Sequence, residues 1–213
     1  QLEKKNIRHL TLAELEAYFL EIGEKKFRAK QVYEWIWQKC ARSFDDMSNI
    51  AKELRTHLAQ SFSLPALSID AVQNSMDGTI KSRFRTFDKH LVEGVLIPTE
   101  ERKTACVSSQ IGCSLTCKFC ATGYMERKRN LTFYEIYDQV AIINKQSLDA
   151  YQQRLTNIVF MGMGEPLLNY ANMMKAIERI SAADGLGMSP KRITVSTAGV
   201  AKMITKLADD NAK

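Results

Sequence analysis

The chain is short of the residues and segments that would complete a structural metal site or cross a membrane. Its 213 residues include five cysteines and three histidines, and no apolar run is long enough to span a bilayer. No signal-peptide pattern is present either. Cysteines in such a chain are typical of a reducing compartment, where disulfides are rare, so we predict a cytoplasmic protein with no membrane partner.

Three of the cysteines lie close together, but no fourth one follows to close a site. The segment GCSLTCKFC places Cys113, Cys117 and Cys120 at spacings of four and three. Structural zinc and iron-sulfur sites normally have four protein ligands, whereas three thiolates can hold three corners of a 4Fe-4S cluster and leave one iron open. We therefore interpret the three thiols as metal ligands of a catalytic 4Fe-4S cluster.

A zinc site is the alternative interpretation of these spacings. Cys106 or a histidine would then have to supply the fourth ligand. The histidines, His9, His57 and His90, are remote from the cysteines in sequence and have no partnered spacing. The pattern favours the cluster, although zinc stays open at this point.

Positive charge exceeds negative charge, with 30 Lys and Arg against 24 Asp and Glu and a formal net charge of +6. This balance favours an anionic partner, although it is also common in proteins that never bind nucleic acid. The 45% apolar and 25% charged fractions are typical of a globular chain, here long enough for one large and one small domain.

Helical periodicity dominates residues 1–62, where we predict a small helical module. Thr11 and Glu14 form a capping-box pattern at the start of the first helix. A second helix is expected from about residue 28 to 39, and Ser48 is expected to cap a third.

Cationic and aromatic side chains are mixed in the second helix. They are Lys25, Lys26, Arg28 and Lys30 beside Tyr33, Trp35 and Trp37. This mixture suits RNA backbone and bases, so the module is a candidate RNA-binding accessory domain. The alternative is that the aromatic rings form the core and the lysines face water, since apolar residues at helical spacing usually pack inward.

Residues 63–99 are expected to form an antiparallel β meander that acts as a linker. Three strand-like runs are separated by turn signals, at residues 67–73, 79–87 and 91–97. In the middle run Lys81, Arg83 and Arg85 alternate with other residues, so period two places three cations on one face. That face could follow phosphates or simply face water.

Residues 100–213 alternate strand and helix patterns and predict an α/β fold with a parallel sheet. The strands are expected at residues 105–109, 157–161 and 192–197, and the helices at about 132–146, 170–183 and 200–209. In such sheets the loops at the carboxyl ends of the strands build the site. The cysteine segment, GMGEP at residues 162–166 and STAG at residues 196–199 all fall there.

Four motifs together resemble the RlmN/Cfr family of radical S-adenosylmethionine RNA methyltransferases. They are the cysteine segment from Cys106 to Cys120, RNL at 129–131, MGMGEPL at 161–167 and VSTAG at 195–199. The resemblance covers nearly the whole chain, including FRAKQV at 27–32. It implies a partial radical SAM (β/α) barrel preceded by the helical module and the meander.

The family resemblance implies a substrate and two cofactors. Most members methylate carbon 2 of an adenosine in 23S rRNA and in certain tRNAs, whereas Cfr methylates carbon 8. Carbon 2 of adenine is not a nucleophile, which explains the need for a radical route through a 4Fe-4S cluster and S-adenosyl-L-methionine. The route also implies an external one-electron reductant and a methyl-cysteine intermediate.

The resemblance also assigns residues. It implies that Gly164, Glu165 and Ser196 contact S-adenosylmethionine, with the Glu165 carboxylate accepting hydrogen bonds from the ammonium group. Glu93 matches the family's proton acceptor, and Cys106 matches the cysteine that resolves a covalent protein-RNA intermediate by forming a disulfide. Without the family, Glu93 would be a solvated carboxylate and Cys106 a buried strand thiol.

The two glycines of GMGEP, Gly162 and Gly164, are expected to allow close backbone approach at the ligand. Without the family, this segment would be interpreted as a strand-to-helix turn with Pro166 at the first helical position.

The chain is expected to be the N-terminal part of such an enzyme. It opens on Gln1, only three βα units are present where six are expected, and the methyl-carrying cysteine should lie beyond Lys213. We expect this chain to be inactive alone. The full-length enzyme is expected to be a monomer, whereas the chain as given could self-associate through an open edge at its third strand.

Three alternatives to carbon 2 methylation stay open. The first is carbon 8 methylation, and the second is another radical enzyme on the same core, such as an activase or a thiotransferase. The latter class does not explain the helical module and Cys106 together. The third is a non-catalytic RNA-binding fragment.

Overall fold

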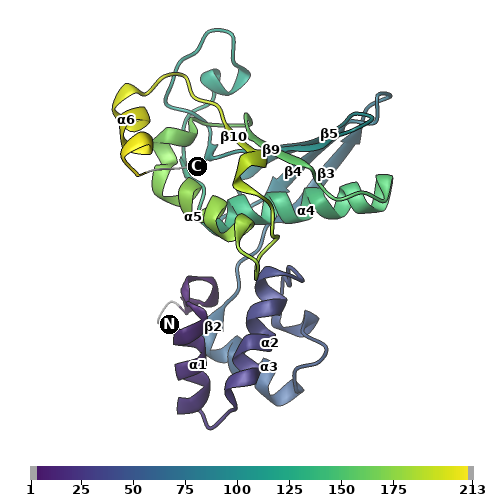
Figure 1. Ribbon diagram of the computed structural model, residues 1–213, viewed down its shortest axis with the longest axis vertical. Helices are drawn as coiled ribbons and strands as arrows, with labels where there is room; N and C mark the ends of the chain where they lie inside the picture. The colour runs from purple at the N-terminus through teal and green to yellow at the C-terminus, as the bar shows by residue number, and fades with distance from the viewer. Residues whose placement is uncertain (1–3, 211–213) are drawn as a thin grey trace. The chain divides into compact units, whose positions relative to one another are not determined.

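The computed structural model describes residues 4–210 and divides the chain into two compact units (Figure 1). The first unit runs up to Ala66 and includes the short segment Ala183–Leu186. The second unit contains Leu67–Ala182 and the chain from Gly187 on. In the described part of the chain, no helix is both long and apolar enough to cross a membrane.

The first unit is a helical module with one small pair of parallel strands. Its elements are β1 (Lys5–Asn6), α1 (Leu12–Glu21), α2 (Lys26–Trp37), α3 (Lys52–Ser61) and β2 (Phe62–Ser63), with short 3-10 helices at Ile7–His9 and Phe44–Asp46. Strand β1 pairs with β2, which the sequence did not indicate. The core consists of buried apolar side chains such as Phe19, Val32 and Leu58.

The predicted start of α1 is confirmed, and that of α3 is wrong. The Thr11 side chain accepts the N–H of Glu14, and the Glu14 carboxylate accepts the N–H of Thr11 at 2.7 Å. Ser48 does not cap α3, whose N-cap is Ala51. The backbone N–H of Ser48 donates to the carbonyl of Asp46 in the turn that follows the preceding 3-10 helix, and α3 begins at Lys52.

The aromatic residues of α2 divide between core and surface. Tyr33 and Trp37 are buried, as the core alternative predicted. Trp35 is half-buried, with the Lys39 ammonium 4.2 Å from its ring centroid. Phe27 is half exposed beside Arg28. Of the aromatic rings in this helix, only those of Phe27 and Trp35 are therefore accessible to a partner.

The second unit is built on one six-stranded mixed sheet in the order β10-β9-β6-β5-β4-β3. The strands are β3 (Ser68–Asn74), β4 (Ile80–Arg85), β5 (Leu91–Pro98), β6 (Lys103–Cys106), β9 (Asn157–Phe160) and β10 (Ile193–Val195). Strands β6, β9 and β10 are parallel, and β3 to β6 are antiparallel neighbours. The meander and the parallel strands expected from the sequence both occur, and they share this sheet.

The division into domains at residues 62 and 99 stays a prediction. A shared sheet joins the strands on both sides of residue 99, but it does not show which parts of the chain fold or act on their own.

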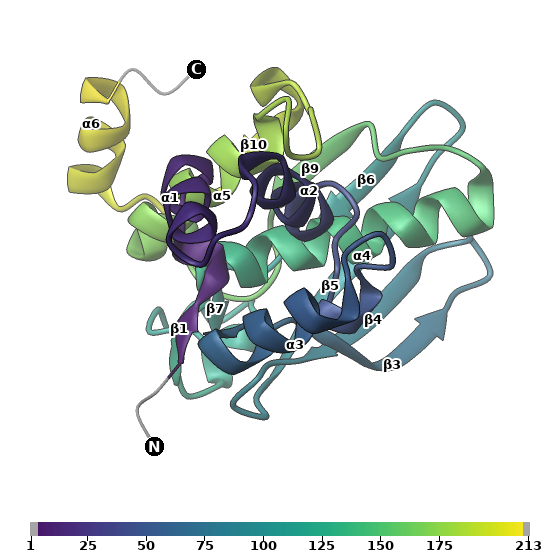
Figure 2. The ribbon, with the colours of Figure 1, turned by 90° about the horizontal axis from the view of Figure 1, so that it is seen from below.

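Two helices cover one face of the sheet. They are α4 (Phe133–Tyr151) and α5 (Tyr170–Ser181), which lie beside each other in Figures 1 and 2. The remaining elements are α6 (Ala201–Asp209), the antiparallel pair β7 (Gln110–Ile111) and β8 (Arg129–Asn130), and 3-10 helices at Ala121–Tyr124, Pro166–Asn169 and Pro190–Arg192. Thr132 and Glu135 form a capping box at the start of α4.

Alternation along β4 assigns the two faces of the sheet. Ser82 and Phe84 are buried, and the Gln146 side chain of α4 donates to the Ser82 hydroxyl at 2.7 Å. The cations of β4 are exposed, so they lie on the face opposite α4, as period two predicted.

Two phenylalanines near the end of β4 test this assignment of faces. Phe84 is fully buried, whereas Phe87 is 60% exposed with the Arg129 guanidinium over its ring. We expect Phe84→Ala to lower the free energy of unfolding by about 3–5 kcal/mol. Phe87→Ala should lower it by less than about 1 kcal/mol, the range of an exposed cation-π contact. Urea denaturation followed by circular dichroism measures both, and equal losses would contradict the assignment.

Candidate active site

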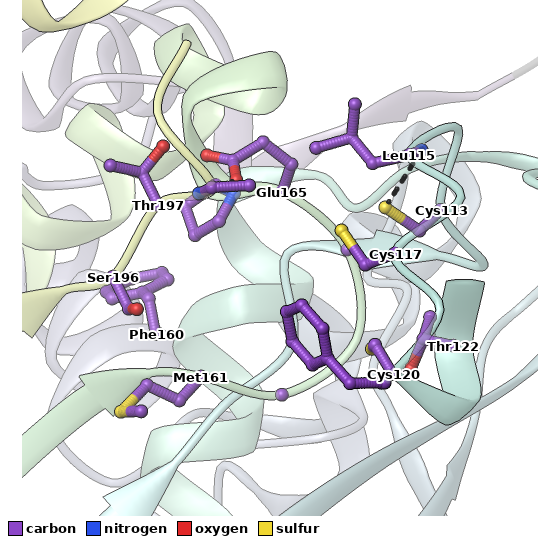
Figure 3. Close-up of a pocket in the computed structure, with 15 residues that line it drawn as sticks. Cys113, Leu115, Cys117, Cys120, Thr122, Phe160, Met161, Glu165, Ser196 and Thr197 are labelled. Carbon is purple, nitrogen blue, oxygen red and sulfur yellow. Dashed lines mark hydrogen bonds between the residues drawn. The ribbon is translucent and has the colours of Figure 1, made fainter.

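Three loops at one edge of the sheet enclose a pocket of about 230 Å³. Its lining includes Cys113, Cys117 and Cys120 from the first loop, Glu165 from the second, and Ser196 and Thr197 from the third. Figure 3 shows the three cysteines on one side of the pocket and the other three side chains on the opposite side. The three sequence motifs therefore meet in space.

The cysteine loop is held by its own backbone. The N–H of Cys120 donates to the carbonyl of Cys117 at 3.0 Å, just before the 3-10 helix Ala121–Tyr124. The Cys113 thiol accepts the N–H of Leu115 at 3.4 Å, drawn as a dashed line in Figure 3. The loop follows β7, because the strand expected at residues 105–109 ends at Cys106.

The arrangement of the thiols fits an open 4Fe-4S cluster. All three are free and half-buried. Within residues 4–210, no three His, Cys, Asp or Glu side chains lie close enough together to hold one metal ion. A cluster does not require that closeness, because each thiolate binds a separate iron. Cys106 is not among the lining residues, so zinc with Cys106 as fourth ligand has no support.

Glu165 is only 3% exposed, and its hydrogen bonds connect the segments that form the site. Its Oε1 accepts the N–H of Leu167 at 3.0 Å, which caps the 3-10 helix Pro166–Asn169. Its Oε2 accepts the N–H of Ala198, in the loop after β10, at 2.8 Å. The N–H of Glu165 itself donates to Oε1 of Gln110 in β7 at 2.9 Å. One residue therefore connects all three loops.

The remaining capacity of Glu165 allows a ligand contact as well. Each carboxylate oxygen has a second lone pair, so two backbone donors do not saturate the group. Pro166 follows at the first position of the 3-10 helix, as the sequence predicted.

The two glycines after β9 lie against the chain itself. A Cβ at Gly162 would lie 2.6 Å from the Ser108 hydroxyl oxygen and 2.8 Å from the Val107 carbonyl oxygen. Gly164 has a φ of +91°, and a Cβ there would collide with the Gln110 side chain. We expected these glycines to let the backbone approach a ligand. They instead let it approach residues 107–110, although both glycines also line the pocket.

Sequence reasoning missed two buried amides that organise the loops. Gln110 is 0% exposed and orients Glu165, as described above. Asn169 donates from Nδ2 to the carbonyls of Ser109 and Leu131, at 2.7 Å each. The only sequence signal was a polar residue within the cysteine segment or just after GMGEPL, and burial is not visible from that.

The two residues expected to act on the substrate lie on neighbouring strands. Cys106 is opposite Val95 in the pairing of β6 with β5, and Glu93 is two residues before Val95. Glu93 and Cys106 therefore share a face as diagonal neighbours, about 7–8 Å apart. Neither belongs to the lining of the pocket.

The surroundings of these two residues differ. The Glu93 carboxylate is half exposed and pairs with the Lys81 ammonium at 2.8 Å. Burial raises the pKa of the Cys106 thiol, which therefore holds its proton at neutral pH. Cys106 is a free thiol like the other four cysteines, so the disulfide implied by the family has no support in the described residues.

Arg129, which the sequence showed only as part of the RNL motif, binds two carboxylates. Its Nε lies 2.7 Å from Asp88 in the β4–β5 turn, and its Nη1 lies 2.8 Å from Glu135 in the first turn of α4. Burial alone would lower the pKa of Arg129, but the hydrogen bonds to both carboxylates hold it above its ordinary value. The hydrogen bond from Arg129 holds the pKa of Asp88 well below its usual range.

Two family models match the chain. Residues 5–64 match the ribosomal RNA large subunit methyltransferase N-terminal domain. Residues 107–212 match the radical SAM superfamily, and this range contains the three cysteines and the loops after β9 and β10.

Curated proteins resemble the chain along its whole length. A probable dual-specificity RNA methyltransferase RlmN from Cytophaga hutchinsonii is 58% identical over 213 residues, which is 100% of this chain and 58% of that protein. A dual-specificity RNA methyltransferase RlmN from Geotalea uraniireducens is 44% identical over 97% of this chain and 58% of its own. The chain thus spans about three fifths of the relatives it matches.

A solved structure gives the same result. A radical SAM methyltransferase from Sphaerobacter thermophilus matches with a TM-score of 0.86 and 40% identity, over 96% of this chain and 60% of that one. With both family models and these identities, the chain belongs to the RlmN family of the radical SAM superfamily, which uses a 4Fe-4S cluster and S-adenosylmethionine.

Proposed function

We propose that this chain is the cofactor-binding part of an enzyme that methylates carbon 2 of an adenosine in 23S rRNA and in tRNA. The observation that carries the proposal is the pocket in which Cys113, Cys117 and Cys120 together face Glu165 and Ser196. The relatives named dual-specificity RNA methyltransferases support the RNA substrate. No specific observation favours carbon 8 methylation or a non-catalytic fragment.

The cysteine wall of the pocket would hold the cluster. Cys113, Cys117 and Cys120 would each bind one iron, and the pocket leaves space for an outside ligand at the fourth. When bound, the cluster and S-adenosylmethionine supply a one-electron route to a carbon that is no nucleophile, with the electron coming from an external reductant.

The opposite wall would orient S-adenosylmethionine. Glu165 accepts hydrogen bonds from its ammonium group through the lone pairs that Leu167 and Ala198 leave free. Ser196 is exposed at the same wall and offers a hydroxyl group. The buried position of Glu165 strengthens such a charged contact, because water is largely excluded there.

Glu93 and Cys106 would act on the RNA. Glu93 is an exposed carboxylate held at its place by Lys81, and it would accept the proton that leaves carbon 2. Cys106 lies on the same face, and its sulfur would bond to the sulfur of the methyl-carrying cysteine. The carbon–sulfur bond to the RNA would break in that step, and the released carbon would take up a proton to become the methyl group. The methyl-carrying cysteine and the rest of a (β/α) barrel would belong to the part of the enzyme that this chain does not span.

The first test is the assembly of the cluster. After anaerobic reconstitution with iron and sulfide, we expect the reduced chain to give a cluster signal in electron paramagnetic resonance. Replacing Cys113, Cys117 or Cys120 by Ala should abolish the signal, because two thiolates leave two irons without protein ligands. Cys40→Ala and Cys106→Ala are matched controls that should keep it, since neither thiol lines the pocket. A cluster that survives loss of all three cysteines would contradict the site.

The second test concerns S-adenosylmethionine. We expect Glu165→Gln to weaken its binding about tenfold or more, because the charged hydrogen bond contributes about 1.5–3 kcal/mol. The measurement is a titration of the spectral change that the ligand causes in the reconstituted chain. Glu126→Gln, which alters an exposed carboxylate near the cysteine loop, should leave the affinity unchanged. Equal affinities in the two variants would contradict the contact between Glu165 and the ammonium group of S-adenosylmethionine. If the unmodified chain gave no spectral response to S-adenosylmethionine, the proposed function itself would be contradicted.

A further inference from the structure

The antiparallel half of the sheet presents a strip of cations, of which the site described above uses only Lys81, the partner of Glu93. Lys81, Arg83 and Arg85 of β4 are exposed, whereas the residues between them are buried toward α4. The strip lies on the face that also carries Glu93 and Cys106. Its position relative to these two residues follows from the strand register.

The register places the strip next to the residues proposed to act on RNA. Arg83 is opposite Glu93, and Lys81 is opposite Val95, which in turn is opposite Cys106. Neighbouring strands are about 4.8 Å apart, so β4 lies about 5 Å from the strand of Glu93 and about 10 Å from that of Cys106. Phosphates beside a nucleotide bound at Glu93 and Cys106 come within reach of β4.

A β-bulge fixes two of the cations side by side. Ile69 and Ala71 of β3 pair with consecutive residues of β4, which makes Asp70 the extra residue. Bulges re-aim a side chain, and here the Asp70 carboxylate accepts the Nε–H of Arg83 at 2.6 Å and also binds Arg85. The hydrogen bond from Arg83 holds the pKa of Asp70 below its ordinary value.

A hollow of about 320 Å³ opens beside these side chains. It is lined by Ala71, Val72, Gln73, Lys81, Arg83 and Glu93. Arg83 binds Asp70 through Nε, and its two outer nitrogens have no hydrogen-bond partner among the described residues. A guanidinium group with these donors free matches the paired oxygens of a phosphate.

A purely structural role explains these contacts less well. The Asp70 side chain is 9% exposed, and one arginine would already pair its carboxylate. Arg83 and Arg85 are themselves about half exposed, so a second ion pair at this bulge adds little to stability. We infer that Arg83 and Arg85 bind the phosphodiester backbone of RNA beside the methylated nucleotide. The inference rests on the RNA substrate proposed above and adds the strand over which the RNA passes.

Salt-dependent RNA binding tests the inference. Fluorescence anisotropy measures binding of the chain to a labelled, adenosine-containing single-stranded RNA oligonucleotide over a range of KCl concentrations. Arg83→Gln with Arg85→Gln should weaken binding about tenfold or more, and should reduce the slope of log affinity against log salt by about 1.4, the value for two phosphate contacts. Arg83→Lys with Arg85→Lys keeps both charges and should keep the slope.

A matched double variant controls for loss of charge alone. Arg102 and Arg154 are exposed and precede β6 and β9, so they lie at the edge of the sheet opposite the site. Arg102→Gln with Arg154→Gln should leave both affinity and slope unchanged. Equal weakening by this variant and by the β4 variant would overturn the inference.

Asp70→Asn separates a phosphate site from a structural ion pair. Removal of this carboxylate should tighten RNA binding about fivefold, because a like charge beside the phosphate is lost. A structural ion pair predicts instead that loss of either partner impairs binding. Weaker binding by Asp70→Asn would therefore overturn the inference and leave the proposed function standing. Absence of RNA binding by the unmodified chain would overturn both.

Discussion

The buried carboxylate of Glu165 is the constraint on which the geometry of the candidate site depends. It accepts the backbone N–H groups of Leu167 in the 3-10 helix that follows it and of Ala198 in the loop after β10, and its own N–H donates to Gln110 in β7. A buried N–H without an acceptor costs about 1–3 kcal/mol, so Gln110 and Glu165 are held where they accept the buried N–H groups of Glu165 and Leu167. The relative places of the cysteine wall and of Ser196 thus follow from a polar network at the sheet edge, in addition to the apolar core beneath it.

A second polar contact joins the antiparallel half of the sheet to α4 and to the segment after the cysteine loop. Arg129 directly follows the cysteine loop and β7, and it binds Asp88 of the β4–β5 turn and Glu135 of α4 at the same time. Glu135 is 2% exposed, so loss of the guanidinium group would leave a buried charge unpaired. The Arg129 guanidinium group therefore links the β4–β5 strand pair, which carries Glu93, to the end of the cysteine loop.

Local signals in the sequence predicted much of the fold, and contacts distant in sequence were beyond them. The capping box at Thr11, the alternation along β4 and the meeting of three motifs all depend on spacing within a few residues or on the common edge of parallel strands. Gln110 and Glu165 are 55 residues apart, and no periodicity connects them. Ser48 lies in a turn that ends before α3, whose N-cap is Ala51, and the bulge at Asp70 is visible only in the pairing of β3 with β4.

The direction of β5 explains why Glu93 and Cys106 meet. Strand β5 is antiparallel to β6, so a residue early in β5 lies beside the last residue of β6. A shift of one residue in this register would turn Glu93 to the face that α4 covers. Burial of Val92 and Leu96, both 0% exposed, opposes that shift, because it would move both side chains into water. Packing on the helix-covered face thereby sets the positions of the residues proposed to act on the opposite face.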